Sequence, residues 1–157
     1  MIYKSLQVGQ KRSRFCKKAD EDFIKDINRK KPSTMEQLAD IWYERYPRES
    51  RYAHYNSSRY HLLNYHSVFT KGTIEFRAFN ATLHAGKIKA YIQFCLAISH
   101  QALIQKSAST KKTQSTNEKY TYRTWLLRLG LIGDEFTTAR QHLLASLDGN
   151  IAWRNAA

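Results

Sequence analysis

The chain has 157 residues, of which 42% are hydrophobic and 13% aromatic, enough for one domain with a buried core. Its formal net charge of +13 favours anionic partners such as nucleic acids, nucleotide phosphates, acidic lipids or acidic peptides. We find neither a signal peptide nor an apolar run of about 18 residues, so we expect a cytoplasmic protein with no membrane partner.

The first segment, residues 1–8, is short and amphipathic and has no helix-starting residue before it, which predicts the end of an element that begins upstream. A basic run, KRSRFCKK at residues 11–18, follows it. Such runs are typical of solvated loops and also of phosphate-binding segments. Cys16 and Cys95 lie far apart without C-x-x-C spacing, which indicates reduced thiols in a cytoplasmic protein.

Two helices are predicted in the first third of the chain. Residues 20–28 place apolar side chains at helical spacing behind acidic residues that suit a helix N-terminus. Ser33 and Glu36 fit a capping box, in which a hydroxyl and a carboxylate each accept from a free amide. We therefore expect a helix over 34–46 with a buried stripe of Met35, Leu38, Ile41 and Trp42. A polar, Tyr-rich loop follows at 48–58.

The stretch from residue 59 to 80 predicts two short strands joined by a Gly-containing turn, a small antiparallel sheet. Because strand side chains alternate between faces, we expect one buried face (Ile74, Phe76, Ala78) and one shared by Thr73, Glu75, Arg77 and Phe79. Burying either charge alone is costly, so the carboxylate and guanidinium need a partner, a ligand or water. A plain ion pair on a half-exposed sheet explains the pattern equally well.

The second half of the chain is predicted to be helical. A long helix over 83–105, capped by Asn80 or Thr82, carries an apolar stripe of Ile88, Tyr91, Ile92, Cys95, Leu96, Ser99 and Leu103. A linker rich in Ser, Thr and Lys follows at 106–119, and we expect it to be mobile. Helices over 120–130 and 134–147 complete an α+β fold in which several helices pack on the small sheet.

The last two helices also allow an alternative function. A short Gly-containing turn between two helices of a basic protein is compatible with a helix-turn-helix that binds nucleic acid, with Arg140, Gln141 and His142 as groove-reading candidates. An ordinary helical hairpin is the commoner explanation. The six histidines lack zinc-site spacing, and the chain contains no P-loop, dinucleotide fingerprint or nucleophile elbow.

The strand region resembles a known family. Arg59-Tyr60-His61, Leu63-Asn64 and the run GTIEFRAFN at 72–80 are similar to the C-terminal half of the amidoligase family. The similarity continues through IKAYIQFCLAISHQAL and TYRTWLLRLGLIGDEF, so it covers most of the chain. The resemblance implies a glutamine-synthetase-like catalytic fold and an ATP-dependent carboxylate–amine ligase.

Such ligases activate a carboxylate with ATP and let an amine attack the acyl-phosphate. By this resemblance, Glu75 is expected to hold a metal ion, Mg²⁺ or Mn²⁺, and Arg77 to bind the phosphate or the substrate carboxylate. Asn64 and Arg59 are expected to assist them in the catalytic site. The partners implied are a nucleotide and a carboxylate or amine substrate, which includes peptides and proteins.

One feature of the family pattern is absent. Family members carry a further acidic strand of the F-G-x-E-x-E type that completes the metal site, and Glu75 is the only strand carboxylate found here. A single carboxylate does not hold two Mg²⁺ ions. We therefore expect residues 1–157 to be a single domain that forms the C-terminal part of an amidoligase domain. An N-terminal half or a partner chain would supply the rest of the site, and two alternatives stay open: the chain is inactive alone, or it is active as it stands.

Overall fold

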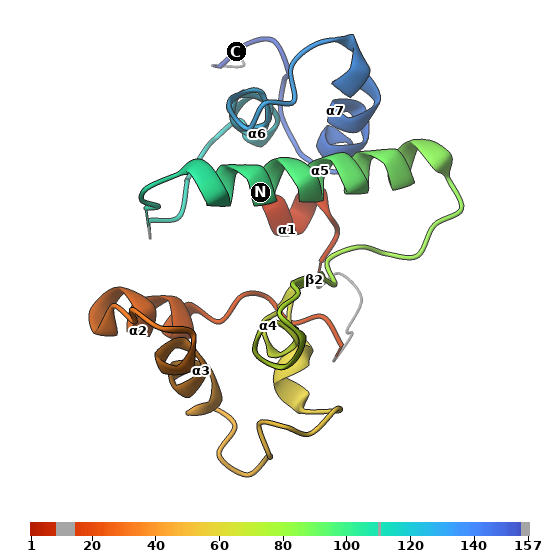
Figure 1. The fold of residues 1–157 in the computed structure, drawn as a ribbon. Helices are drawn as coiled ribbons and strands as arrows, with labels where there is room; N and C mark the ends of the chain where they lie inside the picture. Colours follow the sequence, from red (N-terminus) through yellow and green to blue (C-terminus); the bar gives the residue numbers. More distant parts are fainter. Residues whose placement is uncertain (9–14, 110, 155–157) are drawn as a thin grey trace. The chain divides into compact units, whose positions relative to one another are not determined.

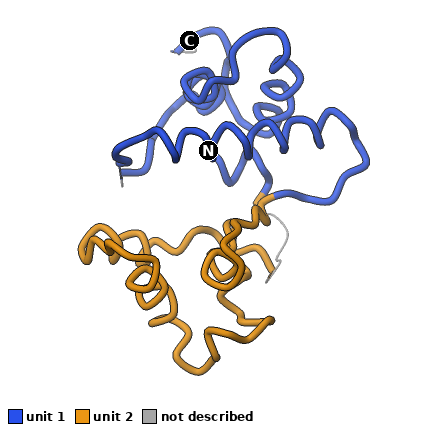
Figure 2. The backbone as a smooth tube through the Cα atoms, in the orientation of Figure 1, with its two compact units in different colours: residues 1–7, 79–157 blue, residues 8–78 orange. Residues whose placement is uncertain are grey.

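The computed structural model describes residues 1–8, 15–109 and 111–154. Backbone contacts divide the chain into two compact units, which Figure 2 shows in different colours. Unit 1 combines residues 1–7 with residues 79–157, and unit 2 is formed by residues 8–78. Helices and a two-stranded antiparallel sheet make up the chain, so the predicted α+β class is confirmed. A single domain over the whole chain stays a prediction.

The described residues of unit 2 form the sheet and three α-helices. Its elements are α2 (Glu21–Lys30), α3 (Met35–Tyr43), the 3-10 helix η1 (Ser57–Arg59), β1 (Leu63–Asn64), α4 (His66–Lys71) and β2 (Glu75–Phe76). The two strands pair antiparallel, with Leu63 opposite Phe76 and Asn64 opposite Glu75. Each strand has only two residues, so the sheet positions a few side chains and contributes little to the core.

The predicted connection between the strands is wrong: helix α4 takes the place of a turn (Figure 1). Phe69 from this helix packs against the hydrophobic core, and this tertiary contact overrides the strand preference of an aromatic residue. The helix ends at Gly72, whose φ of 69° is a left-handed conformation that suits glycine. The predicted buried face of the second strand is also only partly correct, because Ala78 is buried but Ile74 is 46% exposed.

Helices α2 and α3 begin with side-chain caps. Asp20 accepts hydrogen bonds from the amides of Asp22 and Phe23, as expected from the acidic start of α2. The capping box of α3 is shifted by one residue from the prediction: Thr34 and Gln37 form it rather than Ser33 and Glu36. Gln37 Oε1 accepts from the Ser33 amide at 2.8 Å, so Ser33 lies just before the cap.

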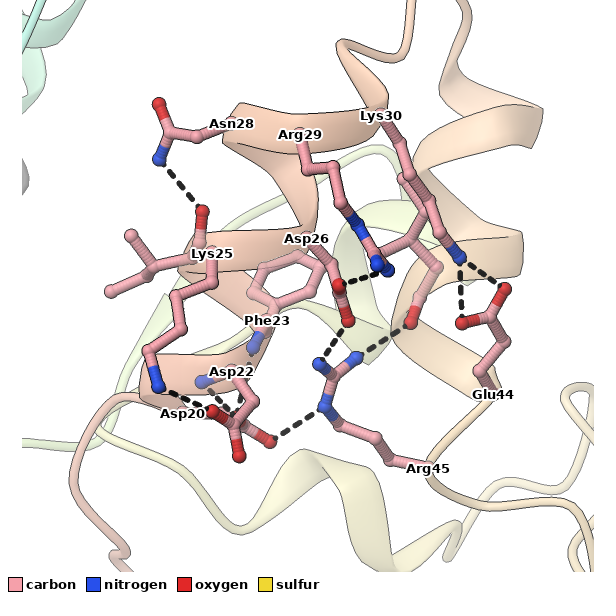
Figure 3. Close-up of polar contacts among 12 residues, drawn as sticks. Asp20, Asp22, Phe23, Lys25, Asp26, Asn28, Arg29, Lys30, Glu44 and Arg45 are labelled. Carbon is pink, nitrogen blue, oxygen red and sulfur yellow. Dashed lines mark hydrogen bonds and ion pairs between the residues drawn. The ribbon is translucent and has the colours of Figure 1, made fainter.

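An aromatic core joins α2 and α3. Its buried members are Phe23, Ala39, Ile41, Trp42 and Tyr43. The rings of Phe23 and Trp42 meet edge to face at 4.6 Å between centroids. Arg45, just after α3, bonds to Asp20 at 3.2 Å and to Asp26 at 2.7 Å, which holds the end of α3 against α2 (Figure 3).

Unit 1 is helical in the part that the structure describes. It contains α1 (Ile2–Ser5), α5 (Ala85–Ile104), α6 (Glu118–Arg128), the 3-10 helix η2 (Asp134–Phe136) and α7 (Thr137–Leu144). Helix α7 packs against both α5 and α6 (Figure 1). The buried side chains are mostly leucines, among them Leu126, Leu131 and Leu143. The predicted helix over 134–147 is thus a 3-10 turn followed by a shorter α-helix that ends at Leu144.

The predicted buried stripe of the long helix is wrong. Ala90 and Phe94 are the buried residues of α5, whereas Ile92 is 56% and Leu103 86% exposed. The helix has apolar residues all round, so periodicity alone could not show which face packs against α7. Its cap is His84, which accepts from the Lys87 amide, rather than Asn80 or Thr82. No helix among the described residues is long and apolar enough to span a membrane.

Candidate functional site

The strand pair in unit 2 brings three of the expected site residues into contact. Asn64 lies opposite Glu75, and its Nδ2 donates to Glu75 Oε2 at 2.6 Å. Arg77 Nη1 donates to the other carboxylate oxygen, Glu75 Oε1, at 2.8 Å. Both oxygens of Glu75 therefore accept a hydrogen bond, one of them within an ion pair. The ion pair expected as the plain alternative is present, and it lies next to a pocket.

Asn64 is held in place by the start of α4. Its Oδ1 accepts from the Ser67 amide at 3.3 Å, and Ser67 Oγ contacts the carbonyl oxygens of Asn64 and Thr73 at 2.8 and 2.9 Å. Asn64 and Ser67 are both buried, so these bonds are shielded from water. The serine thus links both strand ends and fixes the amide that holds Glu75.

A pocket of about 150 Å³ opens beside this contact. Arg59, Asn64 and Glu75 line it, so the structure brings three of the four expected residues to one cavity. Arg77 is not among the lining residues and reaches the pocket through Glu75. Sequence reasoning did not single out the remaining lining residues as site residues: Tyr52, His54, His66, Ser67, Thr70 and Lys71.

Arg59 is oriented by two tyrosine rings. Its guanidinium carbon lies 5.7 Å from the ring centroid of Tyr55 and 5.9 Å from that of Tyr60. Such cation–π contacts restrict a long side chain. Arg59 Nη1 donates to the carbonyl oxygen of His54 at 3.1 Å, whereas its Nε is buried without a hydrogen-bond partner. Arg59 has no ion pair with a carboxylate among the described residues.

The loop that carries Tyr52, His54 and Tyr55 is fixed by polar contacts at its ends. Asn56 is fully buried; its Nδ2 donates to the Ser50 carbonyl oxygen at 3.0 Å and its Oδ1 accepts from the Ser58 amide at 2.9 Å. Glu49 accepts from both the amide and the hydroxyl of Ser57, and these bonds lower the pKa of its carboxyl group. The polar loop expected at 48–58 is therefore an ordered pocket wall.

His66 is the pocket histidine whose protonation state the contacts define. Its Nε2 lies 3.0 Å from the Ala53 carbonyl oxygen, which can only accept, so Nε2 carries the proton. Its Nδ1 then accepts from the Tyr43 hydroxyl at 2.5 Å. Burial lowers the pKa of His66, which favours this neutral form. Both ring nitrogens are used, so His66 supports the pocket wall rather than acting as a free base.

Glu75 is a carboxylate at neutral pH. Burial acts to raise its pKa, but the hydrogen bond from Asn64 and the charge of Arg77 outweigh burial and lower the pKa. Arg77 offsets this negative charge directly. Arg59 and Lys71 then give the pocket lining an excess of positive charge, which suits an anion.

The donor set does not fit a divalent cation held by the described residues. Mg²⁺ needs an octahedral set of oxygen ligands. In the part of the chain that the structure describes, no group of three His, Cys, Asp or Glu side chains could hold a metal ion. Among the described residues that line the pocket, Glu75 is the only acidic side chain, and it already accepts from Asn64 and Arg77. Its role as a metal ligand stays a prediction that this geometry does not favour.

Two of the missed pocket residues had a weak sequence signal. Lys71 directly precedes Gly72, and His54 lies in the Tyr-rich loop. Lys71 lines the same pocket as Asn64 and Arg59 because residues 66–71 form a helix, which the sequence pattern did not predict. His66 carried no signal of its own, because its partners Tyr43 and Ala53 come from distant segments.

The contacts of Arg140 do not support the alternative function, in which this side chain would bind nucleic acid. Arg140 Nη1 donates to the carbonyl oxygens of Leu131 and Gly133 at 2.8 and 2.9 Å, so its side chain ties the turn before α7. His142 packs against the ring of His84. Lys11, Arg12 and Arg14 of the basic run at 11–18, which could bind phosphates of a nucleic acid, lie outside the described residues.

Comparison with known proteins connects this site to a family. The family model described as "Putative amidoligase enzyme" matches residues 1–99, which is 99 of 157 residues and includes the whole pocket. No curated protein and no solved structure matched the chain. The match covers more than half of the chain and confirms the family that the strand residues predicted. The chain therefore belongs to the amidoligase family.

Proposed function

We propose that this chain takes part in ATP-dependent amide-bond formation between a carboxylate and an amine. The observation that carries the proposal is the pocket itself, where Arg59, Asn64 and Glu75 converge and Arg77 is paired to Glu75. These residues come from three segments of the matched family region. Their convergence supports a shared site rather than four unrelated surface side chains.

The proposed reaction has two steps. A carboxylate oxygen of the substrate attacks the terminal phosphorus of ATP, and ADP leaves, which gives an acyl-phosphate. The amine nitrogen then attacks the acyl carbon, inorganic phosphate leaves and the nitrogen loses a proton. Both steps concentrate negative charge on oxygen atoms, and fixed cationic donors stabilise such charge.

The chain's own residues supply cationic donors and their support. Arg59 faces the pocket with most of its five N–H donors unused. Lys71 adds a second positive charge to the lining. Asn64, Glu75 and Arg77 form a hydrogen-bonded row that fixes the pocket edge. Because the residues do not form a metal site, we assign no step to an ion that they hold; Mg²⁺ would accompany ATP as part of the co-substrate.

Hydroxylamine trapping tests this proposal without knowledge of the amine. Hydroxylamine attacks an acyl-phosphate and leaves a hydroxamate that iron(III) colours. The purified chain would be incubated with ATP, Mg²⁺, hydroxylamine and a panel of amino acids and short peptides. We expect ATP-dependent hydroxamate from at least one carboxylate, reduced at least tenfold by Arg77→Ala, because the change frees the Glu75 carboxylate to repel the anionic substrate.

Arg48→Ala is the matched control. Arg48 is an exposed arginine of the same unit that neither lines the pocket nor forms an ion pair with a described residue. Its removal should leave hydroxamate formation unchanged. Thermal unfolding of each variant would show that the fold is intact. Absence of hydroxamate with every carboxylate of the panel, or equal activity of Arg77→Ala and the original chain, would contradict the proposal.

A further inference from the structure

The pocket in unit 2 contains a guanidinium, Arg59, that forms no ion pair among the described residues; its charge acts on Glu75, but that carboxylate is already bonded to Arg77 and Asn64. Some arginines of the same unit are paired, Arg45 with Asp20 and Asp26 and Arg51 with Asp40 at 2.8 Å, whereas the exposed Arg48 has no ion pair with a described residue. Arg59 has no such partner among the described residues, although it borders a cavity and its Nε is buried. A partly buried guanidinium without a carboxylate is costly unless an anion completes it.

The same arginine is held ready for a ligand. The rings of Tyr55 and Tyr60 flank it at 5.7 and 5.9 Å, and its bond to the His54 carbonyl oxygen uses one Nη1 donor. A guanidinium that is already oriented loses little rotamer entropy when it binds. Its remaining donors match the paired oxygens of a carboxylate or a phosphoryl group.

The charges around the cavity select against a free cation. Glu75 is the only acidic side chain in the described part of the lining, and it is bonded to both Arg77 and Asn64. Lys71 lies on the same lining and adds to the charge of Arg59. Either ligand would meet two positive side chains and one carboxylate that is already bonded to Arg77 and Asn64, and this excess of positive charge favours an oxyanion over a divalent cation.

The size of the cavity limits what it can take. Its volume of about 150 Å³ is below the roughly 300 to 1,000 Å³ typical of sites that enclose a drug-sized ligand. A whole nucleotide does not fit, but a single anionic group does. We propose that this pocket binds one oxyanion, a carboxylate or phosphoryl group, on Arg59 without a divalent cation. The inference rests on the proposed function in one respect: the anionic group is taken to belong to a substrate of the ligation.

Calorimetric titration with two simple anions tests the proposal. Sodium phosphate and sodium acetate would be titrated into the full chain at constant ionic strength, once with EDTA and once with magnesium chloride. We expect saturable binding of at least one anion in EDTA, with the same affinity when Mg²⁺ is present. Phosphate alone would assign the site to a phosphoryl group, acetate alone to a substrate carboxylate, and both to either group; each result supports an oxyanion pocket.

Three substitutions separate this site from a metal site. Arg59→Gln should weaken binding about tenfold or more, because a charge-assisted contact is lost. Arg48→Gln, with the same loss of charge outside the pocket, should change it less than twofold. Glu75→Gln should keep or strengthen anion binding, because it removes the negative charge nearest to the ligand. If Glu75 instead held a metal ion, anions would bind only when Mg²⁺ is present, and Glu75→Gln would abolish that binding.

The outcomes distinguish this inference from the proposed function. No binding of either anion in EDTA, or binding that needs Mg²⁺ and disappears in Glu75→Gln, overturns the oxyanion pocket. Equal binding by Arg59→Gln and Arg48→Gln also overturns it. If Arg59→Gln unfolds, Lys71→Gln tests the same positive lining at an exposed position and should weaken binding. Anion binding without any hydroxamate would leave the pocket assigned and refute the ligase, and the reverse pattern would refute the pocket alone.

Discussion

The two units of this chain are stabilised in different ways. Unit 2 contains most of the buried polar side chains among the described residues, and all six lie between residues 56 and 67. In unit 1 the buried polar side chains are Ser5 and Asn117, and the rest of its described core is apolar and rich in leucine. A leucine core can pack well from shape alone, but buried amides and imidazoles must find hydrogen-bond partners. The polar core of unit 2 therefore specifies the loops that form the pocket.

Truncation of the aromatic core of unit 2 should produce the largest difference in stability between the two units. Trp42 is 1% exposed and touches the rings of Phe23 and Tyr65. Trp42→Ala should destabilise the chain by about 3 to 5 kcal/mol, the range for large buried aromatic residues. Hydrogen exchange should then show a greater loss of protection in α2 and α3 than in α6. Equal loss in all three helices would contradict a separate core in unit 2.

A pair of substitutions on α5 tests which face of this helix is buried. Phe94 is 2% exposed, whereas Leu96 is 66% exposed although the sequence pattern placed it in the core. Phe94→Ala should cost about 3 to 5 kcal/mol. Leu96→Ala should change stability by no more than about 0.5 kcal/mol, as for other surface substitutions. Denaturant unfolding measures both, and a larger cost for Leu96→Ala would restore the original prediction.

The polar core of unit 2 should make stability depend on pH. Burial lowers the pKa of His66 below its usual value of 6.5, so the unfolded chain binds this proton more readily than the folded chain. The resulting stabilisation is complete above pH 6.5 and is lost as the pH falls through the lowered folded-state pKa. For one histidine the slope cannot exceed about 1.4 kcal/mol per pH unit. The protonated ring could not accept from Tyr43, which gives this loss a structural cause.

Unfolding measured from pH 7.5 to 5, with His66→Gln as the comparison, would test this dependence. His142 in unit 1 also has a pKa lowered by burial and by the charge of His84, so the substitution should reduce the slope without abolishing it. An unchanged slope in His66→Gln would contradict the expected contribution of His66.

The smallest predicted effect concerns the cap of α3. Thr34→Ala should cost about 1 kcal/mol, because Thr34 Oγ1 accepts from the Gln37 amide. Ser33→Ala should cost only a few tenths of a kcal/mol, because it removes only the exposed hydroxyl that donates to Gln37 Oε1 at 3.1 Å, while the Ser33 amide still donates to the same oxygen. Thermal unfolding of the two variants compares adjacent positions directly. A larger loss of stability in Ser33→Ala than in Thr34→Ala would show that Ser33 is the cap.

Much of the secondary structure was predictable because capping and helical periodicity are local. The helix after Asp20, the long helix near residues 85–104 and the two final helices all appear close to their expected ranges. The connection between the strands was missed because Phe69 gains its stability from the distant Trp42 and Tyr43 cluster. In the expected mobile linker at 106–119, the described residues 106–109 and 111–117 form no helix or strand before α6 begins at Glu118, and the mobility of the linker stays a prediction.

The candidate site was predictable in part for a similar reason. Glu75 and Arg77 are two residues apart on an extended segment, so covalent geometry alone places them on one side. Asn64 reaches Glu75 only through the pairing register of the strands. Lys71 and His66 join the pocket only because α4 replaces a turn.

The sequence by itself determined the α+β class, the family and the proximity of Glu75 to Arg77, because each follows from short-range patterns along the chain. Only the tertiary structure decided which face of α5 packs against α7, since that helix is apolar on both sides. The tertiary structure also decided that Arg77 forms an ion pair with Glu75, while Arg59 lines the pocket without an ion pair to any described carboxylate. The distribution of counter-charges depends on which side chains folding brings together, and no local pattern encodes it.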